Sequence, residues 1–152
     1  MSGSVATARG GSVTVAMRGR RAPGLARRVG KSARRVLAVL GLPGAELSVL
    51  LVSDAEMRKL NRAYRGQDRA TDVLSFSQLE GVGRVAGLLG DVVISVDTAR
   101  RQAAERGERV GAEVDRLLVH GILHLLGWDH ERSRAEADRM RRRERALARC
   151  LR

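Results

Sequence analysis

The spacing of apolar residues divides this chain into strands and helices. Segments that alternate apolar and polar residues, or that are apolar throughout, predict four short strands. These strands cover residues 12–17, 46–52, 73–76 and 91–95. Apolar residues three and four positions apart predict helices over residues 24–40, after a cap at Ser53 or Asp54, and over residues 97–105, 111–126 and 133–151. A glycine-rich loop is expected between the third and fourth strands.

The helix predicted over residues 111–126 is apolar on nearly all sides. Its second half contains Leu117, Leu118, Val119, Ile122, Leu123, Leu125 and Leu126. A helix without a polar face is normally buried, so we expect this one to be the central helix. The 152 residues contain no internal repeat and no linker. One α+β domain over residues 1–152, with four strands packed against helices, is therefore the expected architecture.

All three histidines of the chain lie within residues 120–130. His120 and His124 are four residues apart, so on a helix they share one face and can bind one cation. Gly127 is expected to end that helix in a left-handed conformation and to bring His130 back as a third ligand. Three histidines leave one position of a zinc ion open, which is typical of a catalytic site. The alternative is a chance cluster of histidines.

The histidine spacing matches the HExxHxxGxxH pattern of metzincin proteases except at one position. Gly121 stands where those proteases have the glutamate that takes a proton from water. We expect the missing side chain to leave room for a bulky phosphodiester. A metalloprotease remains an alternative. Against it, this chain lacks the general base, and a protease does not need the strong positive charge of this chain.

The chain is strongly basic, with 29 Lys and Arg residues against 17 Asp and Glu residues and a net charge of +12. The first fifty residues contain nine basic residues and one acidic residue. Such an excess of positive charge attracts polyanions and favours nucleic acid as the partner. Most of the basic residues are arginines, but this preference over lysine is explained more simply by an ordinary solvated surface in which arginine replaces lysine. The lone Cys150 and the lack of a membrane-length apolar run or a secretory signal predict a soluble, cytoplasmic protein.

Four motifs in order resemble the YbeY family of bacterial endoribonucleases. They are residues 60–66 (LNRAYRG), 71–76 (TDVLSF), 89–91 (LGD) and 120–130 (HGILHLLGWDH). The resemblance implies a zinc-dependent, single-strand-directed RNase that acts in ribosomal RNA maturation, at the 3′ end of small-subunit RNA, and in ribosome quality control. It also implies a mixed four-stranded sheet. The family usually has a proline after Ser-Phe, whereas Ser77 and Gln78 follow here.

The resemblance assigns a role to one residue outside the histidine motif, and the residue types at four other positions suggest further candidates. Arg65 corresponds to the functional arginine of the family, and a guanidinium suits the negative charge of a phosphodiester transition state. Ser75 and Phe76 are candidates for substrate binding, although their segment is also explained as a core strand. Asp91 and Asp129 are candidates to orient a ligand histidine, or simply begin a strand and cap a turn.

The predicted mechanism is phosphodiester cleavage with His120, His124 and His130 as zinc ligands and with His120 and Arg65 as the catalytic residues. The nucleophile, activated water or the RNA 2′-hydroxyl, is left open. A second class of function is also open, in which zinc is structural and the protein only binds ribosomal RNA. The expected partners are ribosomal RNA and ribosomal particles, and a ribosomal protein or GTPase as a further partner is left open.

Overall fold

A computed structural model of the chain describes residues 7–10, 13–19, 22–77, 87–129 and 131–152. Within these residues the elements are β1 (Thr7–Gly10), β2 (Val13–Arg18), α1 (Pro23–Val39), β3 (Glu46–Val52), α2 (Asp54–Arg65), β4 (Val73–Ser77), β5 (Leu88–Ser95), α3 (Val96–Arg106), α4 (Val110–Leu125) and α5 (Arg134–Cys150). The strands form one sheet in the order β1-β2-β3-β5-β4. The β2–β3 and β3–β5 pairs are parallel and the two outer pairs are antiparallel, so the sheet is mixed.

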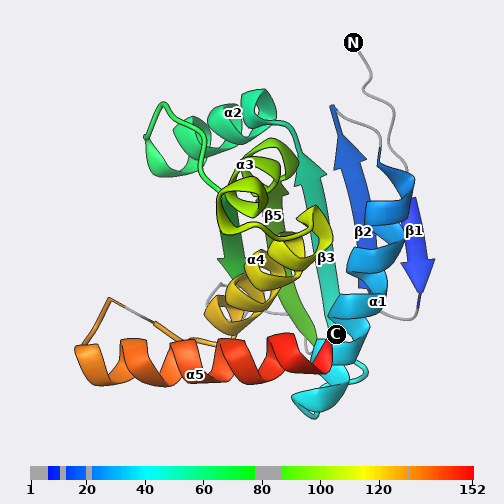
Figure 1. Cartoon of the computed structure of the whole chain (residues 1–152), viewed down its shortest axis with the longest axis vertical. Helices are drawn as coiled ribbons and strands as arrows, with labels where there is room; N and C mark the ends of the chain where they lie inside the picture. Colours follow the sequence, from blue (N-terminus) through cyan, green and yellow to red (C-terminus); the bar gives the residue numbers. More distant parts are fainter. Residues whose placement is uncertain (1–6, 11–12, 20–21, 78–86, 130) are drawn as a thin grey trace.

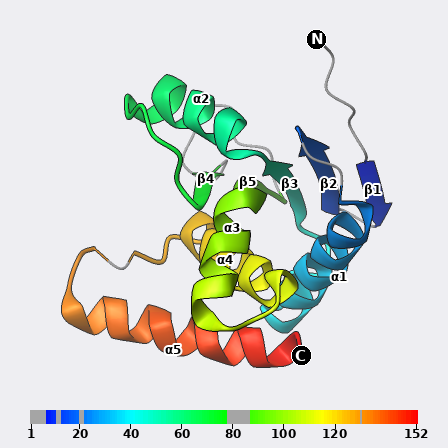
Figure 2. The same ribbon diagram turned by 45° about the horizontal axis from the view of Figure 1, so that its top comes forward.

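Helices cover both faces of the sheet (Figure 1). Helices α1 and α4 lie against one face, and α5 packs across α4 and the end of α1. Helix α2 lies against the opposite face, beside β3, β4 and β5, as the turned view in Figure 2 shows. Strand β4 is therefore an edge strand with α2 on one side and the second half of α4 on the other.

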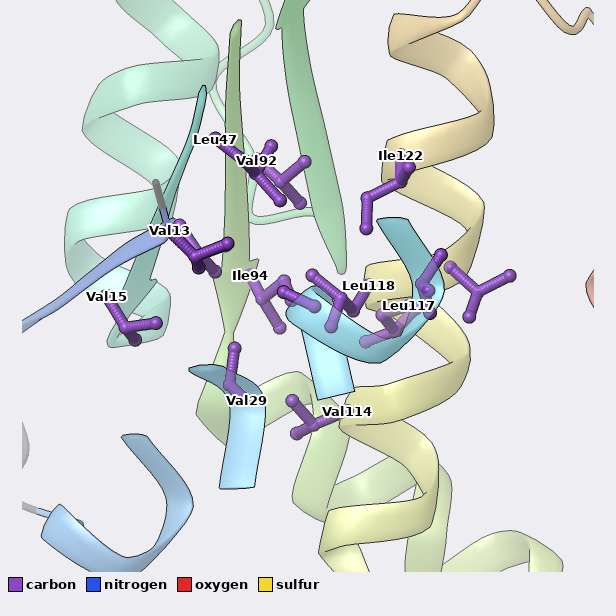
Figure 3. Close-up of a cluster of buried hydrophobic side chains, with 14 of the residues drawn as sticks. Val13, Val15, Val29, Leu47, Val92, Ile94, Val114, Leu117, Leu118 and Ile122 are labelled. Atoms are coloured by element: carbon purple, nitrogen blue, oxygen red, sulfur yellow. The ribbon is translucent and has the colours of Figure 1, made fainter. Parts of the chain in front are cut away.

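The larger hydrophobic core lies between the sheet and helices α1 and α4 (Figure 3). Alternate residues of β2, among them Val13 and Val15, are buried there against Val29 of α1. Helix α4 adds Leu118 and Ile122, both fully buried. Each such side chain contributes about 1.5–3 kcal/mol through burial. The prediction of α4 as the central helix is confirmed.

The predicted α+β fold with a mixed sheet is confirmed, and all four predicted strands and five predicted helices are present. The sheet has one further strand, β1, which pairs antiparallel with β2. Residues 7–10 (TARG) show no apolar alternation, so periodicity does not mark this strand in the sequence. Gly81 and Gly83 of the predicted glycine-rich loop lie outside the described residues. Among the helices that the structure describes, none has both the length and the apolar character to cross a membrane.

The N-termini of α2 and α3 are held together by a network of hydrogen bonds around Asp54. The Asp54 carboxylate accepts hydrogen bonds from Ser95 Oγ (2.6 Å), Thr98 Oγ1 (2.7 Å) and Arg101 (2.8 Å). The Asp54 backbone N–H donates in turn to Asp97 Oδ2 (2.9 Å). Partial burial alone would raise the pKa of Asp54, but these hydrogen bonds and the charge of Arg101 outweigh burial and lower its pKa below the ordinary value.

Candidate functional site

His120 and His124 lie one turn apart on α4, and their imidazole rings converge. Their Nε2 atoms are 3.1 Å apart. Two nitrogens bound to one tetrahedral zinc ion at about 2.0–2.1 Å lie about 3.3–3.4 Å from each other, so the pair fits two ligands of one metal ion. The third predicted ligand, His130, lies outside the described residues, and without it those residues contain no group of three metal-binding side chains.

Gly127 ends α4 as predicted. It has a φ of +93°, in the left-handed region. The Gly127 N–H donates to the His124 carbonyl (3.0 Å) and the Trp128 N–H to the Leu123 carbonyl (3.0 Å), which is the hydrogen-bond pattern of a Schellman motif. The chain therefore leaves the helix at Gly127, and the residues from 127 to 129 line one cleft together with His120 and His124.

Glu144 of α5 contacts His120 and was not among the predicted site residues. Glu144 Oε1 lies 2.9 Å from His120 Nδ1. A carboxylate at this distance favours the tautomer with the proton on Nδ1, which leaves the Nε2 lone pair directed at the point where the two rings converge. A signal was present in the sequence: Glu144 shares a face of α5 with Met140 and Leu147, which are both fully buried. A carboxylate within an apolar stripe indicates a specific partner.

Gly121 has a different role from the one we expected. A Cβ atom at this position would lie 2.7 Å from Val92 Cγ1 and 3.3 Å from Ser75 Oγ. The missing side chain therefore allows α4 to pack closely on β4 and β5, and the position faces Val92 and Ser75 of the sheet. Ser75 Oγ donates a hydrogen bond to the Gly121 carbonyl (3.2 Å) at this contact. A glutamate at Gly121 would overlap Val92, so the protease base has no place in this packing.

Arg65 is the last residue of α2, and its side chain lines the same cleft as His120 and His124. The cleft has a volume of about 730 Å³. The loop after α2 is tied back to the helix by a hydrogen bond from Asn61 Nδ2 to the Arg69 carbonyl (2.8 Å). Within the part of the chain that the structure describes, the Arg65 side chain forms no hydrogen bond or ion pair. Its five N–H donors are therefore available to a ligand.

The rest of the cleft is formed by β4 and the segment after α4. These walls comprise Asp72, Val73, Ser75, Ser77, Leu125, Gly127, Trp128, Asp129, Glu131 and Arg132. Asp129 lines the cleft, and its Oδ1 accepts a hydrogen bond from the Glu131 backbone N–H (2.8 Å), in agreement with the second of its two predicted roles, the cap of a turn. This contact is typical of a carboxylate that shapes a turn.

Two other predicted site residues do not line the cleft. Phe76 lies on the opposite face of β4, where its ring meets that of Tyr64 with centroids 5.2 Å apart. Asp91 lies within β5, paired with Phe76 in the strand register. The carboxylate that contacts His120 is that of Glu144 rather than that of Asp91. Alternation along β4 explains the division, because Ser75 and Ser77 face α4 while Leu74 and Phe76 face α2.

The chain is similar to proteins of known family. The model of the family described as endoribonuclease YbeY matches residues 21–152. A protein of Anaeromyxobacter sp. (strain Fw109-5) named endoribonuclease YbeY is 57% identical over 125 residues, which cover 82% of this chain and 64% of that protein. One of the same name from Geobacter metallireducens is 47% identical over 138 residues, or 89% of this chain and 92% of the relative. The chain thus spans slightly less than two thirds of the Anaeromyxobacter relative and nearly all of the Geobacter one.

A solved structure has a similar fold. The solution structure of a Thermotoga maritima protein superimposes with a TM-score of 0.64 at 25% sequence identity, covering 91% of this chain and 88% of the other. The family match extends from before α1 to the end of α5 and includes the histidine pair, Arg65 and Glu144. The chain belongs to the endoribonuclease YbeY family.

Proposed function

We propose that this protein is a zinc-dependent endoribonuclease that cleaves single-stranded RNA. Its proposed task is the maturation of ribosomal RNA in the cytoplasm, at the 3′ end of small-subunit RNA, together with ribosome quality control on ribosomal particles. Relatives with nearly half or more identical residues are named endoribonucleases. The net charge of +12 favours a polyanionic substrate.

The observation that carries the proposal is an arginine that has no partner among the described residues and lies beside two converging histidines. Arg65, His120 and His124 line one cleft, although Arg65 comes from a different helix on the other side of the sheet edge. Zinc ligands on one wall and a guanidinium on another suit a group with a central phosphorus and several charged oxygens.

Glu144 and Arg65 have separate roles in this mechanism. Glu144 holds the proton on His120 Nδ1 and fixes the orientation of the ring. Arg65 donates N–H groups to the non-bridging oxygens of the scissile phosphate, and these bonds strengthen as negative charge develops there. When bound, a zinc ion supplies a Lewis acid for a phosphoryl oxygen. The product ends identify the nucleophile, because attack by the 2′-hydroxyl leaves a 2′,3′-cyclic phosphate whereas attack by water does not.

The test is RNA cleavage by nuclease-free protein, with Arg65→Ala compared with Arg62→Ala. Arg62 is also exposed on the last turn of α2 but does not line the cleft, so it is a matched control for charge and helix position. We expect zinc-loaded wild-type protein and Arg62→Ala to cleave single-stranded RNA, and Arg65→Ala to bind zinc and cleave poorly. Absence of cleavage by the wild-type protein with one zinc ion bound contradicts the proposal.

A zinc-stabilised factor that binds ribosomal RNA without cutting it is the second candidate. It is favoured by the absence of a side chain at Gly121, where the zinc proteases with this histidine spacing have their general base. The same experiment separates the two functions, since a binding factor would retain RNA tightly and leave it intact under every metal condition.

A further inference from the structure

A second hollow lies beside the N-terminal half of α4, away from the histidines. It has a volume of about 580 Å³ and lies between α1, the start of α4 and the second half of α5. Its lining includes six arginines, namely Arg28, Arg109, Arg116, Arg141, Arg145 and Arg152. Only three acidic residues, Glu108, Asp115 and Glu144, accompany them. We call this hollow the arginine cavity.

Three of the arginines already have carboxylate partners. Arg28 pairs with Asp115 (2.8 Å), Arg116 with Glu113, and Arg141 with Asp138. Asp115 accepts a further hydrogen bond from Ser32 Oγ (2.8 Å), which fixes the carboxylate and therefore Arg28. These pairs neutralise part of the charge at the cavity and hold its walls in place.

The side chains of the other three arginines of the cavity lack such partners among the described residues, and two of these arginines, Arg109 and Arg145, come from different elements. Within the described residues, the side chains of Arg109, just before α4, and Arg145, on α5, form no hydrogen bond or ion pair. The Glu144 carboxylate is engaged by His120, which leaves Glu108 as the one acidic side chain of the lining without a described partner. The cavity therefore has an uncompensated positive charge, which attracts anions.

The arginine cavity adjoins the cleft without sharing a residue with it. The contact between His120 of the cleft and Glu144 of the cavity separates them. Ala112 of the cavity and His120 are eight residues apart on α4, or about 12 Å along the helix axis. A single polynucleotide strand several residues long covers such a distance.

We propose that the arginine cavity binds phosphodiester groups of the RNA strand whose scissile bond lies in the cleft. The inference rests on the proposed function and adds to it a second contact for single-stranded RNA. Arg109 and Arg145 pair with the phosphates, and exposed Ala112 with the accessible parts of half-buried Ala148 and Leu151 offers a base a nonpolar support. Longer RNA therefore binds more tightly than RNA that fills the cleft alone.

The test measures RNA binding by fluorescence anisotropy in EDTA, so that the RNA stays intact. The variant Arg109→Gln/Arg145→Gln is compared with Arg100→Gln/Arg142→Gln, which removes the same charge from α3 and α5 outside both hollows. For an oligonucleotide of about twelve nucleotides we expect about tenfold weaker binding by the cavity variant and a salt slope smaller by about 1.4, the value for two lost contacts to single-stranded RNA. A tetranucleotide should bind both variants nearly alike.

Glu108→Gln is expected to strengthen RNA binding, whereas a folding defect would weaken it. It removes a negative charge from the cavity rim, so the long oligonucleotide should bind several-fold more tightly than it binds to the wild-type protein. Unchanged binding by Glu108→Gln, or equal losses in the two double variants, overturns the inference. AMP tests whether a free nucleotide is the ligand instead. Displacement of the long oligonucleotide by AMP at an equal concentration of phosphate groups overturns the assignment to an RNA strand.

Binding and cleavage outcomes are independent in this design. Wild-type protein that binds the long RNA through the cavity but never cleaves it contradicts the proposed enzyme and leaves the cavity assigned. Cleavage by a protein whose two double variants bind RNA alike contradicts the cavity and leaves the enzyme.

Discussion

The charged residues at the two ends of helix α2 differ in their hydrogen-bond partners. At its start, Asp54 receives hydrogen bonds from Ser95, Thr98 and Arg101. At its end, the side chain of Arg65 has no partner among the described residues and faces a cleft that also contains His120. One helix therefore has a charge fully used by the fold at one end and a charge available to a ligand at the other.

This difference distinguishes a structural polar group from a functional one more clearly than exposure does. A saturated carboxylate stabilises the native state through the donors that it engages, and its loss is measured as a change in stability. A guanidinium without partners contributes little to the stability of the fold, and its loss is measured as a change in ligand binding or turnover. The same contrast holds along α4, where Asp115 is engaged by Arg28 and Ser32 while the rings of His120 and His124 converge at the cleft.

The largest effect is expected from removing a ligand at the cleft. His124→Ala deletes one of the two converging nitrogens, so the purified variant should contain about a tenth of an equivalent of zinc or less, compared with about one in the wild-type protein. Elemental analysis measures this directly, and circular dichroism checks the fold. His124→Cys should retain part of the zinc, because a thiolate also binds this ion. Full zinc occupancy in His124→Ala would remove the metal site from the mechanism.

Arg65 provides the sharpest test of the contrast within α2. Arg65→Ala should lower the single-turnover cleavage rate at saturating RNA by about 10²-fold, the scale for losing one preorganised charge donor, and leave zinc content and melting temperature unchanged. Arg65→Lys should recover only part of the rate, because an ammonium lacks the planar fork of the guanidinium. Asp54→Asn should do the reverse and lower stability with an unchanged rate. If Arg65→Ala cleaves saturating RNA at the wild-type rate, Arg65 has no role in catalysis.

Glu144 should have a smaller effect, because it acts through His120. Glu144→Ala leaves both ligand nitrogens in place but removes the carboxylate that orients one ring, so zinc affinity should fall by about 10-fold or somewhat more. The zinc affinity of Glu144→Gln should lie between those of Glu144→Ala and the wild-type protein, because the glutamine amide oxygen still accepts a hydrogen bond from Nδ1. Glu105→Ala, an exposed carboxylate on α3, is the control. Equal zinc affinity in Glu144→Ala and Glu105→Ala, measured by competition with a chelator, would limit Glu144 to helix packing.

Local signals predicted most of the fold and half of the candidate site. Apolar periodicity located the helices and β2 to β5 to within a few residues, because burial imposes that periodicity. The i, i+4 spacing of His120 and His124 and the position of Gly127 likewise describe contacts within a single turn of chain. Strand β1 was missed because residues 7–10 show no apolar alternation, and its pairing with β2 appears only in the three-dimensional structure.

The remaining parts of the site depend on contacts between distant segments. Glu144 reaches His120 only because α5 crosses α4, and its spacing from the histidine follows no motif. The role of Gly121 was misjudged for the same reason, since Val92 of β5 determines what fits there. Phe76 was grouped with Ser75 by sequence, but neighbouring residues of a strand face opposite sides.

The smallest expected effect is a pH dependence of stability at the structural end of α2. The pKa of Asp54 is lowered in the folded protein, so its contribution to stability is present above the pKa of the unfolded chain and is lost as the pH falls through the lower folded value. Wild-type protein should therefore be more stable than Asp54→Asn by about 1–2 kcal/mol near neutral pH, the scale of charge-assisted hydrogen bonds at a partly exposed site. The difference should shrink below about pH 4, where the Asp54 of the unfolded chain becomes protonated. Urea unfolding of the two proteins over this range gives the difference directly, and all other carboxylates cancel because both chains contain them. A difference that stays constant down to about pH 2.5 would show that the Asp54 charge does not stabilise the start of α2, and the contrast between the two ends of the helix would then rest on Arg65 alone.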